Sequence, residues 1–173
     1  MADHLRHAFS FDIRAREGIP EKLPARGAKI KAQEVEEGLE YENGPLRVSA
    51  FAVDHGAVKP AFGHRVDCSK RSVVISGDTK FCQNLVDFSK GADCLIHVAW
   101  SAESVNRTPR HVRSLASVED AADVFVAVRP KLGVISHYHQ ELGLLEAIRG
   151  KYKGRCIVAK GLTVIKIGKT IRC

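Results

Sequence analysis

Residues 72–79 read Ser-Val-Val-Ile-Ser-Gly-Asp-Thr, a short apolar run that ends in a glycine and a carboxylate. A run of this length, rich in β-branched residues, predicts a buried strand over residues 72–76. After Asp78 the apolar residues take the spacing of a helix, which we expect to extend to Gly91. A buried strand followed directly by a helix is typical of an α/β fold, so this stretch decides the fold class.

The rest of the chain extends this pattern in both directions. Upstream, apolar residues alternate with a period of two, and Glu-Asn-Gly-Pro at residues 42–45 is typical of a hairpin turn. Downstream, short apolar strands alternate with helices. The predicted strands are 28–35, 39–41, 47–54, 61–68, 72–76, 94–99, 132–136, 156–159 and 162–167, and the predicted helices are 3–17, 81–91, 117–128 and 140–151, with a linker at 18–27. We therefore expect an α/β (α+β) fold in which a mixed sheet has helices on one face.

Length and composition exclude several classes of protein. The chain has 173 residues, a mass of 19.0 kDa and a net charge of +7 at pH 7, which predicts a single domain with a basic surface that attracts polyanions. No apolar run approaches the roughly 20 residues of a membrane helix, and the first residues lack an apolar signal core. The five cysteines form no C-x-x-C pair, which indicates reduced thiols. A cytoplasmic protein without membrane contact is expected.

Three predicted strands end in residues that can bind a metal. His55 follows strand 47–54, Asp78 follows strand 72–76, and His137 follows strand 132–136. Functional groups are often placed at strand ends, because the sheet is rigid there and the tip is open. Two imidazoles and a carboxylate at one sheet edge would suit Zn²⁺ or a similar cation.

Each of these residues also has a structural interpretation. Asp78 could cap the helix that begins near Lys80, and His55 before a glycine could belong to a turn. His137 and His139 could both be solvated loop residues. His97 could be a buried histidine whose nitrogens bond to the backbone. Whether His97 or His139 is an additional ligand is left open.

Four segments of the sequence together resemble the metallo-β-lactamase-fold hydrolases, and in particular the branch that contains ribonuclease Z. They are His55-Gly-x-x-x-x-Ala-Phe-Gly-x-Arg, Ser76-Gly-Asp-Thr, Gly91-Ala-Asp-x-Leu-Ile-His97 and Ile135-Ser-His137. The resemblance implies an αββα sandwich with two zinc ions at the edge of two facing sheets. It implies that His55 binds the first metal, that His137 binds the second, and that Asp78 is the catalytic carboxylate that bridges both.

Two features of the family are missing. The family's His-x-His-x-Asp-His motif should precede His55 at a distance, and none of residues 1–54 fits it. The tRNA-processing members carry His-Glu-Ala-Thr where this chain has His97-Val-Ala-Trp, so a carboxylate is lost. The resemblance therefore implies that residues 1–173 form an N-terminally truncated domain, equal to half to two-thirds of the sandwich.

Two functional hypotheses follow. The first is a metal-dependent hydrolase of an ester or phosphodiester, incomplete as this chain. The second is a non-catalytic remnant that binds a partner or RNA. Because the sheet face away from the helices would lack its second sheet, we also expect a homo-oligomer or a second chain that covers it. A phosphorylated substrate is compatible with the first hypothesis.

Overall fold

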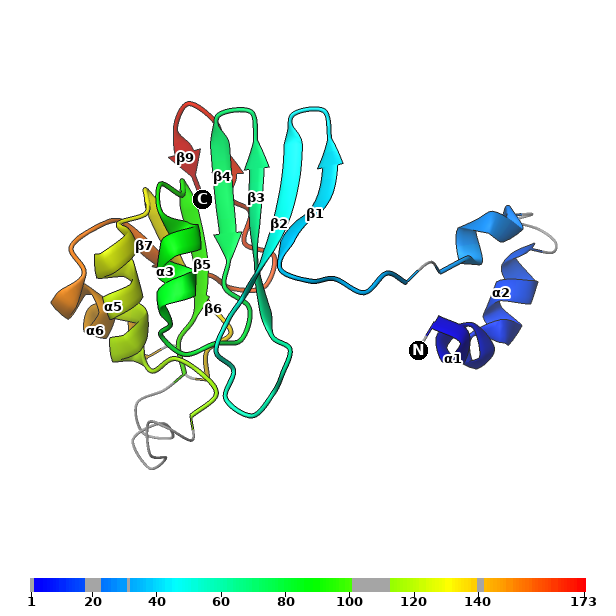
Figure 1. The fold of residues 1–173 in the computed structure, drawn as a ribbon, viewed down its shortest axis with the longest axis horizontal. Helices are drawn as coiled ribbons and strands as arrows, with labels where there is room; N and C mark the ends of the chain where they lie inside the picture. The colour runs from blue at the N-terminus through cyan, green and yellow to red at the C-terminus, as the bar shows by residue number, and fades with distance from the viewer. Residues whose placement is uncertain (1, 18–22, 31, 101–112, 140–141) are drawn as a thin grey trace. The chain divides into compact units, whose positions relative to one another are not determined.

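A computed structural model describes residues 2–17, 23–30, 32–100, 113–139 and 142–173 (Figure 1). It divides into two compact units, Met1–Val35 and Glu36–Cys173, and each is described here by itself. The single domain expected over residues 1–173 stays a prediction. None of the described helices is long and apolar enough to span a bilayer.

The N-terminal unit is helical. It contains α1 (Ala2–Ala8), α2 (Ser10–Glu17) and the 3₁₀ helix η1 (Ala25–Ala28), so part of the expected linker at 18–27 is helical and residues 18–22 lie outside the described part. The strand predicted over 28–35 is wrong: the residues described there form no strand. The apolar residues Ile30 and Val35 that suggested it are 48% and 40% exposed, so they have no sheet to pack into.

The larger unit is built on a seven-stranded mixed sheet whose strands follow one another in chain order. β1 to β4 are antiparallel neighbours, and β4 to β7 are parallel neighbours. The strands are β1 (Gly38–Asn43), β2 (Leu46–Ala52), β3 (Phe62–Cys68), β4 (Arg71–Ile75), β5 (Cys94–Val98), β6 (Leu132–Ser136) and β7 (Cys156–Val158). With these pairings β2, β4, β5 and β6 all run in one direction. They therefore end at one edge of the sheet, which we call the carboxyl edge, and β4 to β7 begin at the opposite amino edge.

Three helices pack on one face of this sheet, as the sequence predicts (Figure 1). They are α3 (Gln83–Ser89), α5 (Val118–Val128) and α6 (Leu144–Lys151). α5 begins with a reciprocal capping box, in which the Ser117 hydroxyl accepts from the Asp120 backbone N–H and the Asp120 carboxylate accepts from the Ser117 N–H. The main core lies between these helices and the sheet and includes the fully buried Phe51, Leu95 and Phe125.

The opposite face is covered only in part by the described residues. Isoleucines 165, 167 and 171 of the C-terminal segment pack on a small cluster formed by Cys94, Leu132 and Val134. This segment contains the short hairpin β8 (Lys166–Ile167) and β9 (Ile171–Arg172), where one closing strand over 162–167 is expected. Farther along the same face Tyr41 is 49% exposed and Ile75 is 43% exposed. The hairpin is thus a same-chain cover for β5 and β6 that the sequence does not predict.

The start of the parallel strands is fixed by one buried carboxylate. Asp93, just before β5, accepts a hydrogen bond from the Ser72 backbone N–H of β4 at 2.9 Å and one from Lys131 Nζ, just before β6, at 2.6 Å. Burial acts to raise the pKa of Asp93, but the hydrogen bonds from Lys131 and Ser72 and the charges of Lys131 and Arg71 hold it below its ordinary value. The charged carboxylate therefore ties three neighbouring strands together.

Replacing Asp93 with alanine should lower the free energy of unfolding by about 1–3 kcal/mol, because a buried N–H loses its acceptor. The midpoint of urea unfolding at pH 7 measures this, with the exposed Asp87→Asn as a control that should leave the midpoint nearly unchanged. Because the folded-state pKa of Asp93 is lowered, its contribution is present above its unfolded pKa and lost as the pH falls through the folded pKa. Equal midpoints for Asp93→Ala and the unaltered protein would contradict this role.

His97 gives a second, separable pH dependence. It is fully buried on the helix-covered face of β5, and burial lowers its pKa from 6.5 to about 4. Between these two values the unfolded chain binds a proton that the folded chain excludes, so stability should fall by up to about 3 kcal/mol as the pH is lowered through that window. In His97→Gln the unfolding midpoint should vary less between pH 6.5 and 4, whereas Ser76→Ala, which keeps the imidazole, should retain the dependence. The same pH profile in His97→Gln and in the unaltered protein would show that His97 is not the group responsible.

Candidate functional site

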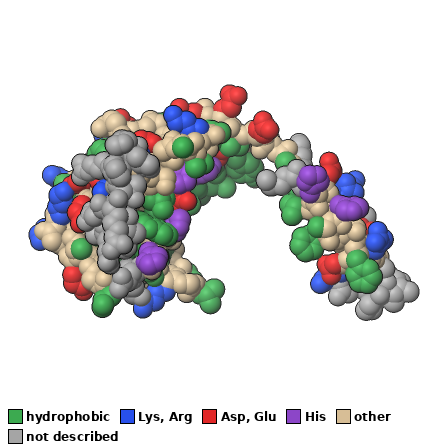
Figure 2. All heavy atoms as spheres, turned by 90° about the horizontal axis from the view of Figure 1, so that it is seen from below, with side chains coloured by type: hydrophobic (Ala, Val, Ile, Leu, Met, Phe, Trp, Pro, Cys, Tyr) green, Lys and Arg blue, Asp and Glu red, His purple; other side chains and the backbone are tan. Residues whose placement is uncertain are grey.

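Asp78 and His137 meet at the carboxyl edge although they follow strands that are not neighbours. Asp78 comes after β4 and His137 after β6, with β5 between them. Asp78 Oδ1 lies 2.7 Å from His137 Nδ1, and both side chains are about half exposed. Figure 2 views the molecule from this side and shows histidine side chains at its surface. The predicted convergence of these two residues is thus present in the structure.

The turn that delivers Asp78 requires a glycine. Gly77 has a φ of +63°, and an added Cβ would lie 2.5 Å from the carbonyl oxygen of Phe62. A side chain at this position would therefore force the β4 end away from β3. Gly77 lets the chain reverse tightly enough for Asp78 to reach the edge.

Trp100 lies beside the candidate site, although the sequence analysis did not include it there. Its indole ring lies edge-on to His137, with ring centroids 5.4 Å apart, and 5.6 Å from the ring of His139. Its backbone N–H donates to the carbonyl of Ala116 at 2.8 Å, which fixes it at the end of β5. The one signal for this role in the sequence is its place directly after the buried strand 94–99.

His55 lies in the loop after β2 and is held by the backbone. Its Nδ1 is 2.7 Å from the carbonyl oxygen of Ser114, which can only accept, so in the neutral imidazole Nδ1 carries the proton and Nε2 has the lone pair. His137 has the same arrangement, because its Nδ1 faces the Asp78 carboxylate. Metal-binding histidines are commonly oriented in this way, through a hydrogen bond from the other ring nitrogen.

Thr79 joins the loops that carry His55 and Asp78. Its fully buried hydroxyl accepts from the Asp54 backbone N–H at 3.1 Å and donates to the Lys80 carbonyl at 2.8 Å. Lys80 in turn forms an ion pair with Asp54 at 3.0 Å. Burial acts to raise the pKa of Asp54, but hydrogen bonds from Gly56 and Lys80 and the charges of Lys80 and Lys59 hold it below its ordinary value. The site loops are therefore fixed to each other and carry a charged pair.

The other histidines that the structure describes do not join Asp78 and His137 in a metal-binding group. The described residues contain no group of three or more His, Cys, Asp or Glu side chains placed to hold a metal ion. A catalytic zinc usually has three protein ligands, so the described residues do not by themselves fit the expected pair of zinc ions. His97 is turned into the helix-covered core, where its Nδ1 faces the Ser76 hydroxyl at 2.8 Å and its Nε2 has no hydrogen-bond partner. The assignment of His55, Asp78 and His137 as ligands stays a prediction.

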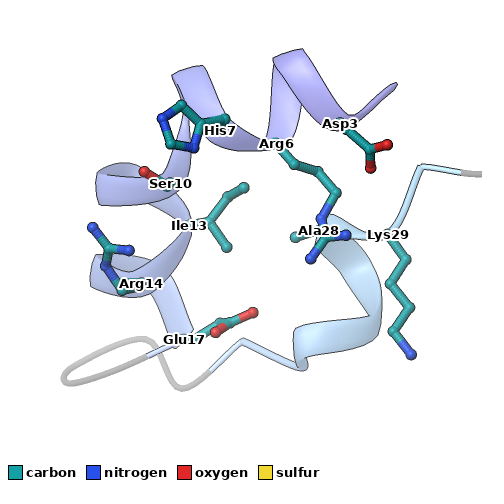
Figure 3. A pocket seen from close by; sticks show the side chains of 9 residues that line it. All are labelled: Asp3, Arg6, His7, Ser10, Ile13, Arg14, Glu17, Ala28 and Lys29. Atoms are coloured by element: carbon teal, nitrogen blue, oxygen red, sulfur yellow. The ribbon is translucent and has the colours of Figure 1, made fainter. Parts of the chain in front are cut away.

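Each of the two units has a surface hollow among its described residues. One, of about 390 Å³, lies beside the Asp54–Lys80 pair and is lined by Phe81 and by the charged residues Arg113, Asp120 and Asp123 as well. The other, of about 470 Å³, belongs to the N-terminal unit, where side chains from α1, α2 and η1 surround it (Figure 3). Its lining is mostly charged or polar, with Ile13 as its one large apolar residue among those described.

Comparison with known proteins places these features in a family. A family model described as the beta-lactamase superfamily domain matches residues 1–138. Ribonuclease Z of Mycobacterium sp. (strain KMS) is 32% identical over 114 residues, which cover 63% of this chain and 40% of that enzyme. The chain thus spans less than half the length of this relative.

Two solved structures share the fold. The metallo-β-lactamase fold protein YhfI from Bacillus subtilis aligns with a TM-score of 0.60 at 18% identity, over 69% of this chain and 49% of that one. Human tRNase Z, short form, aligns with a TM-score of 0.58 at 24% identity, over 75% and 46% respectively. Together with the family model, which matches most of the sequence, these similarities show that the chain belongs to the metallo-β-lactamase superfamily and is related to ribonuclease Z.

Proposed function

We propose that this chain supplies His55, Asp78 and His137 to the metal centre of a metal-dependent hydrolase, with Asp78 as the catalytic carboxylate. The observation that carries the proposal is the 2.7 Å contact between Asp78 and His137 at the carboxyl edge. The reaction we expect of the complete centre is hydrolysis of an ester or phosphodiester by a metal-activated water. A phosphorylated substrate, including RNA, is compatible with this chemistry.

The orientation of the His55 imidazole supports its proposed role. Its Nδ1 faces the Ser114 carbonyl oxygen, so in the neutral ring Nε2 offers a lone pair. An imidazole that was merely solvated would need no such partner. Two imidazoles and one carboxylate are nevertheless too few donors for two zinc ions, and further donors must come from residues outside the described part or from another chain.

The partially covered sheet face is where we place the polypeptide that adds those donors. Tyr41 and Ile75 are both more than 40% exposed on the face opposite the helices. Burying such apolar surface stabilises an association by about 25 cal/mol per Å². We therefore propose that a second copy of the chain or a different chain packs on this face and reaches the carboxyl edge.

The alternative function is a non-catalytic module that binds a partner or RNA. It is favoured by the finding that no three metal-binding side chains lie together among the described residues. Under this alternative the Asp78–His137 contact is a hydrogen-bonded pair that stabilises the loops. The two functions differ in zinc content, which can be measured directly.

The chain by itself should hold far less than one zinc per molecule and should hydrolyse a bis-phosphodiester substrate at the background rate. Adding a polypeptide with the family's His-x-His-x-Asp-His half should restore both, because it supplies the missing donors. Asp78→Asn should then abolish both, since it removes the carboxylate charge, whereas the control Asp87→Asn should not. Zinc content by mass spectrometry and turnover measure the outcome.

Two results would contradict the proposal in different ways. Two tightly bound zinc ions in the chain alone would show that other side chains complete the site, with His139 as the first to test. No zinc and no turnover after complementation would favour the non-catalytic module.

Association through the partially covered face can be tested independently of metal. The protein should form dimers or larger species in light scattering, and Ile75→Glu should shift it toward the monomer without changing its fold. Val126→Glu is the matched control, because Val126 is 39% exposed but lies on α5, on the other side of the sheet. A stable monomer of the unaltered protein at high concentration would rule out self-association through this face.

A further inference from the structure

Nine of the 20 Lys and Arg residues of the larger unit lie in segments at the edge opposite the candidate site. Five connections meet at or beside the amino edge: the β3–β4 turn, the ends of α3, α5 and α6 that lead into β5, β6 and β7, and the β8–β9 turn. The segments 69–71, 90–93, 129–131, 152–155 and 168–172 contain nine Lys or Arg residues and a single acidic residue. These cations, which we call the basic edge, are Lys70, Arg71, Lys90, Arg129, Lys131, Lys153, Arg155, Lys169 and Arg172.

Contacts across the sheet place these segments beside one another. Lys131 and Arg71 both reach the Asp93 carboxylate, at 2.6 Å and 3.5 Å. Arg155 lies next in line, because its carbonyl accepts from the Gly133 N–H of β6. Its guanidinium donates to the carbonyl of Ile171 at 2.7 Å, which attaches the β8–β9 hairpin to the same edge. The four parallel strands are about 4.8 Å apart, so the basic edge is at least about 15 Å wide.

The acidic residue within these segments adds little negative charge to the surface. Asp93 is 3% exposed and is already paired with Lys131. Most of the cations point to solvent: Lys131 and Lys90 have side chains that are 65% and 68% exposed, although Lys90 is paired with Asp87 of α3 at 2.7 Å. Lys70, Arg129, Lys169 and Arg172 are exposed as well, and the described residues give their side chains no ion pair. These four exposed cations without an ion pair favour a polyanion.

We propose that the basic edge binds the phosphate backbone of a nucleic acid. The segments that form it contain no exposed large apolar side chain, whereas binding to a membrane surface normally combines cations with inserted apolar residues. Tyr152, the one aromatic residue in these segments, is buried and donates its hydroxyl to the Pro130 carbonyl, so it cannot stack on a base. Contacts to phosphates alone give binding that depends on salt and not on sequence.

The basic edge is separate from the candidate metal site. Arg71 begins β4 and Asp78 follows its other end, and the strand from Arg71 to Ile75 spans about 13 Å at about 3.3 Å per residue. Binding at this edge therefore needs neither metal nor Asp78, and the inference goes beyond the proposed hydrolase. A nucleic acid held here would be anchored at a distance from the metal centre.

The test is fluorescence anisotropy of a labelled RNA hairpin, and of a DNA hairpin of the same sequence, between about 50 and about 200 mM salt. The unaltered protein should bind both, with log K falling linearly with log salt. The triple variant Lys70→Gln, Lys169→Gln, Arg172→Gln should bind at least tenfold more weakly near 100 mM salt. Its salt slope should be smaller by about 2–3, since each lost phosphate contact contributes about 0.7–0.9.

The matched control neutralises three exposed cations of the N-terminal unit, Arg6→Gln, Arg14→Gln and Lys29→Gln. It changes the net charge by the same amount and should bind like the unaltered protein. Equal losses in the two triple variants would overturn the proposal, because binding would then follow net charge. Unchanged binding in the basic-edge variant, or binding to phosphatidylserine vesicles without binding to RNA or DNA, would overturn it too. Asp78→Asn should leave binding unchanged, which separates failure of this inference from failure of the proposed hydrolase.

Discussion

Strand β4 is hydrogen-bonded to an antiparallel neighbour on one side and to a parallel neighbour on the other, and the rest of the structure depends on this change of direction. Because β2 and β4 are both antiparallel to β3, they end at the same edge. Because β5 and β6 are parallel to β4, their ends join them. Asp93 stabilises this arrangement by linking the starts of the three strands. If β4 were antiparallel to β5, Asp78 and His137 would still follow strands, but β4 and β6 would end at opposite edges of the sheet.

The two edges of the sheet therefore differ in chemistry. The carboxyl edge carries imidazoles, carboxylates and Trp100, whereas the basic edge carries Lys and Arg. Among parallel strands, all the carboxyl ends lie at one edge of the sheet and all the amino ends at the other. Residues that follow the strands therefore gather at one edge, and residues that precede the strands gather at the opposite edge. This separation would allow the proposed metal centre and the proposed polyanion site to lie at different edges. The same sheet also leaves an apolar face that the C-terminal hairpin covers over β5 and β6.

Hydrogen bonds to the backbone hold the loops of the candidate site in place more than contacts between pairs of side chains do. The Thr79 hydroxyl is bonded to the backbone of Asp54 and Lys80, and His55 is bonded to the backbone of Ser114. Backbone partners depend on how loops pack and not on which side chains they carry. Trp100 is also held by the backbone, since its N–H donates to the carbonyl of Ala116 and this places its ring beside His137. Such contacts have no fixed spacing along the chain, so sequence reasoning did not assign Trp100 to the site.

The sequence by itself determined the elements and the identity of the strand-end residues. The apolar run at 72–76 became β4, the predicted helix at 117–128 became α5, and Asp78 and His137 came to one edge as the alternation of strands and helices predicts. Periodicity and capping are local, so they can be read from neighbouring residues. Tertiary structure alone decided that residues 28–35 form no strand, that the β8–β9 hairpin covers part of the second face, and that His97 faces the core. Each of these depends on whether a distant segment supplies a hydrogen-bond partner or an apolar surface. Such segments lie too far along the chain to be predicted from a local sequence pattern.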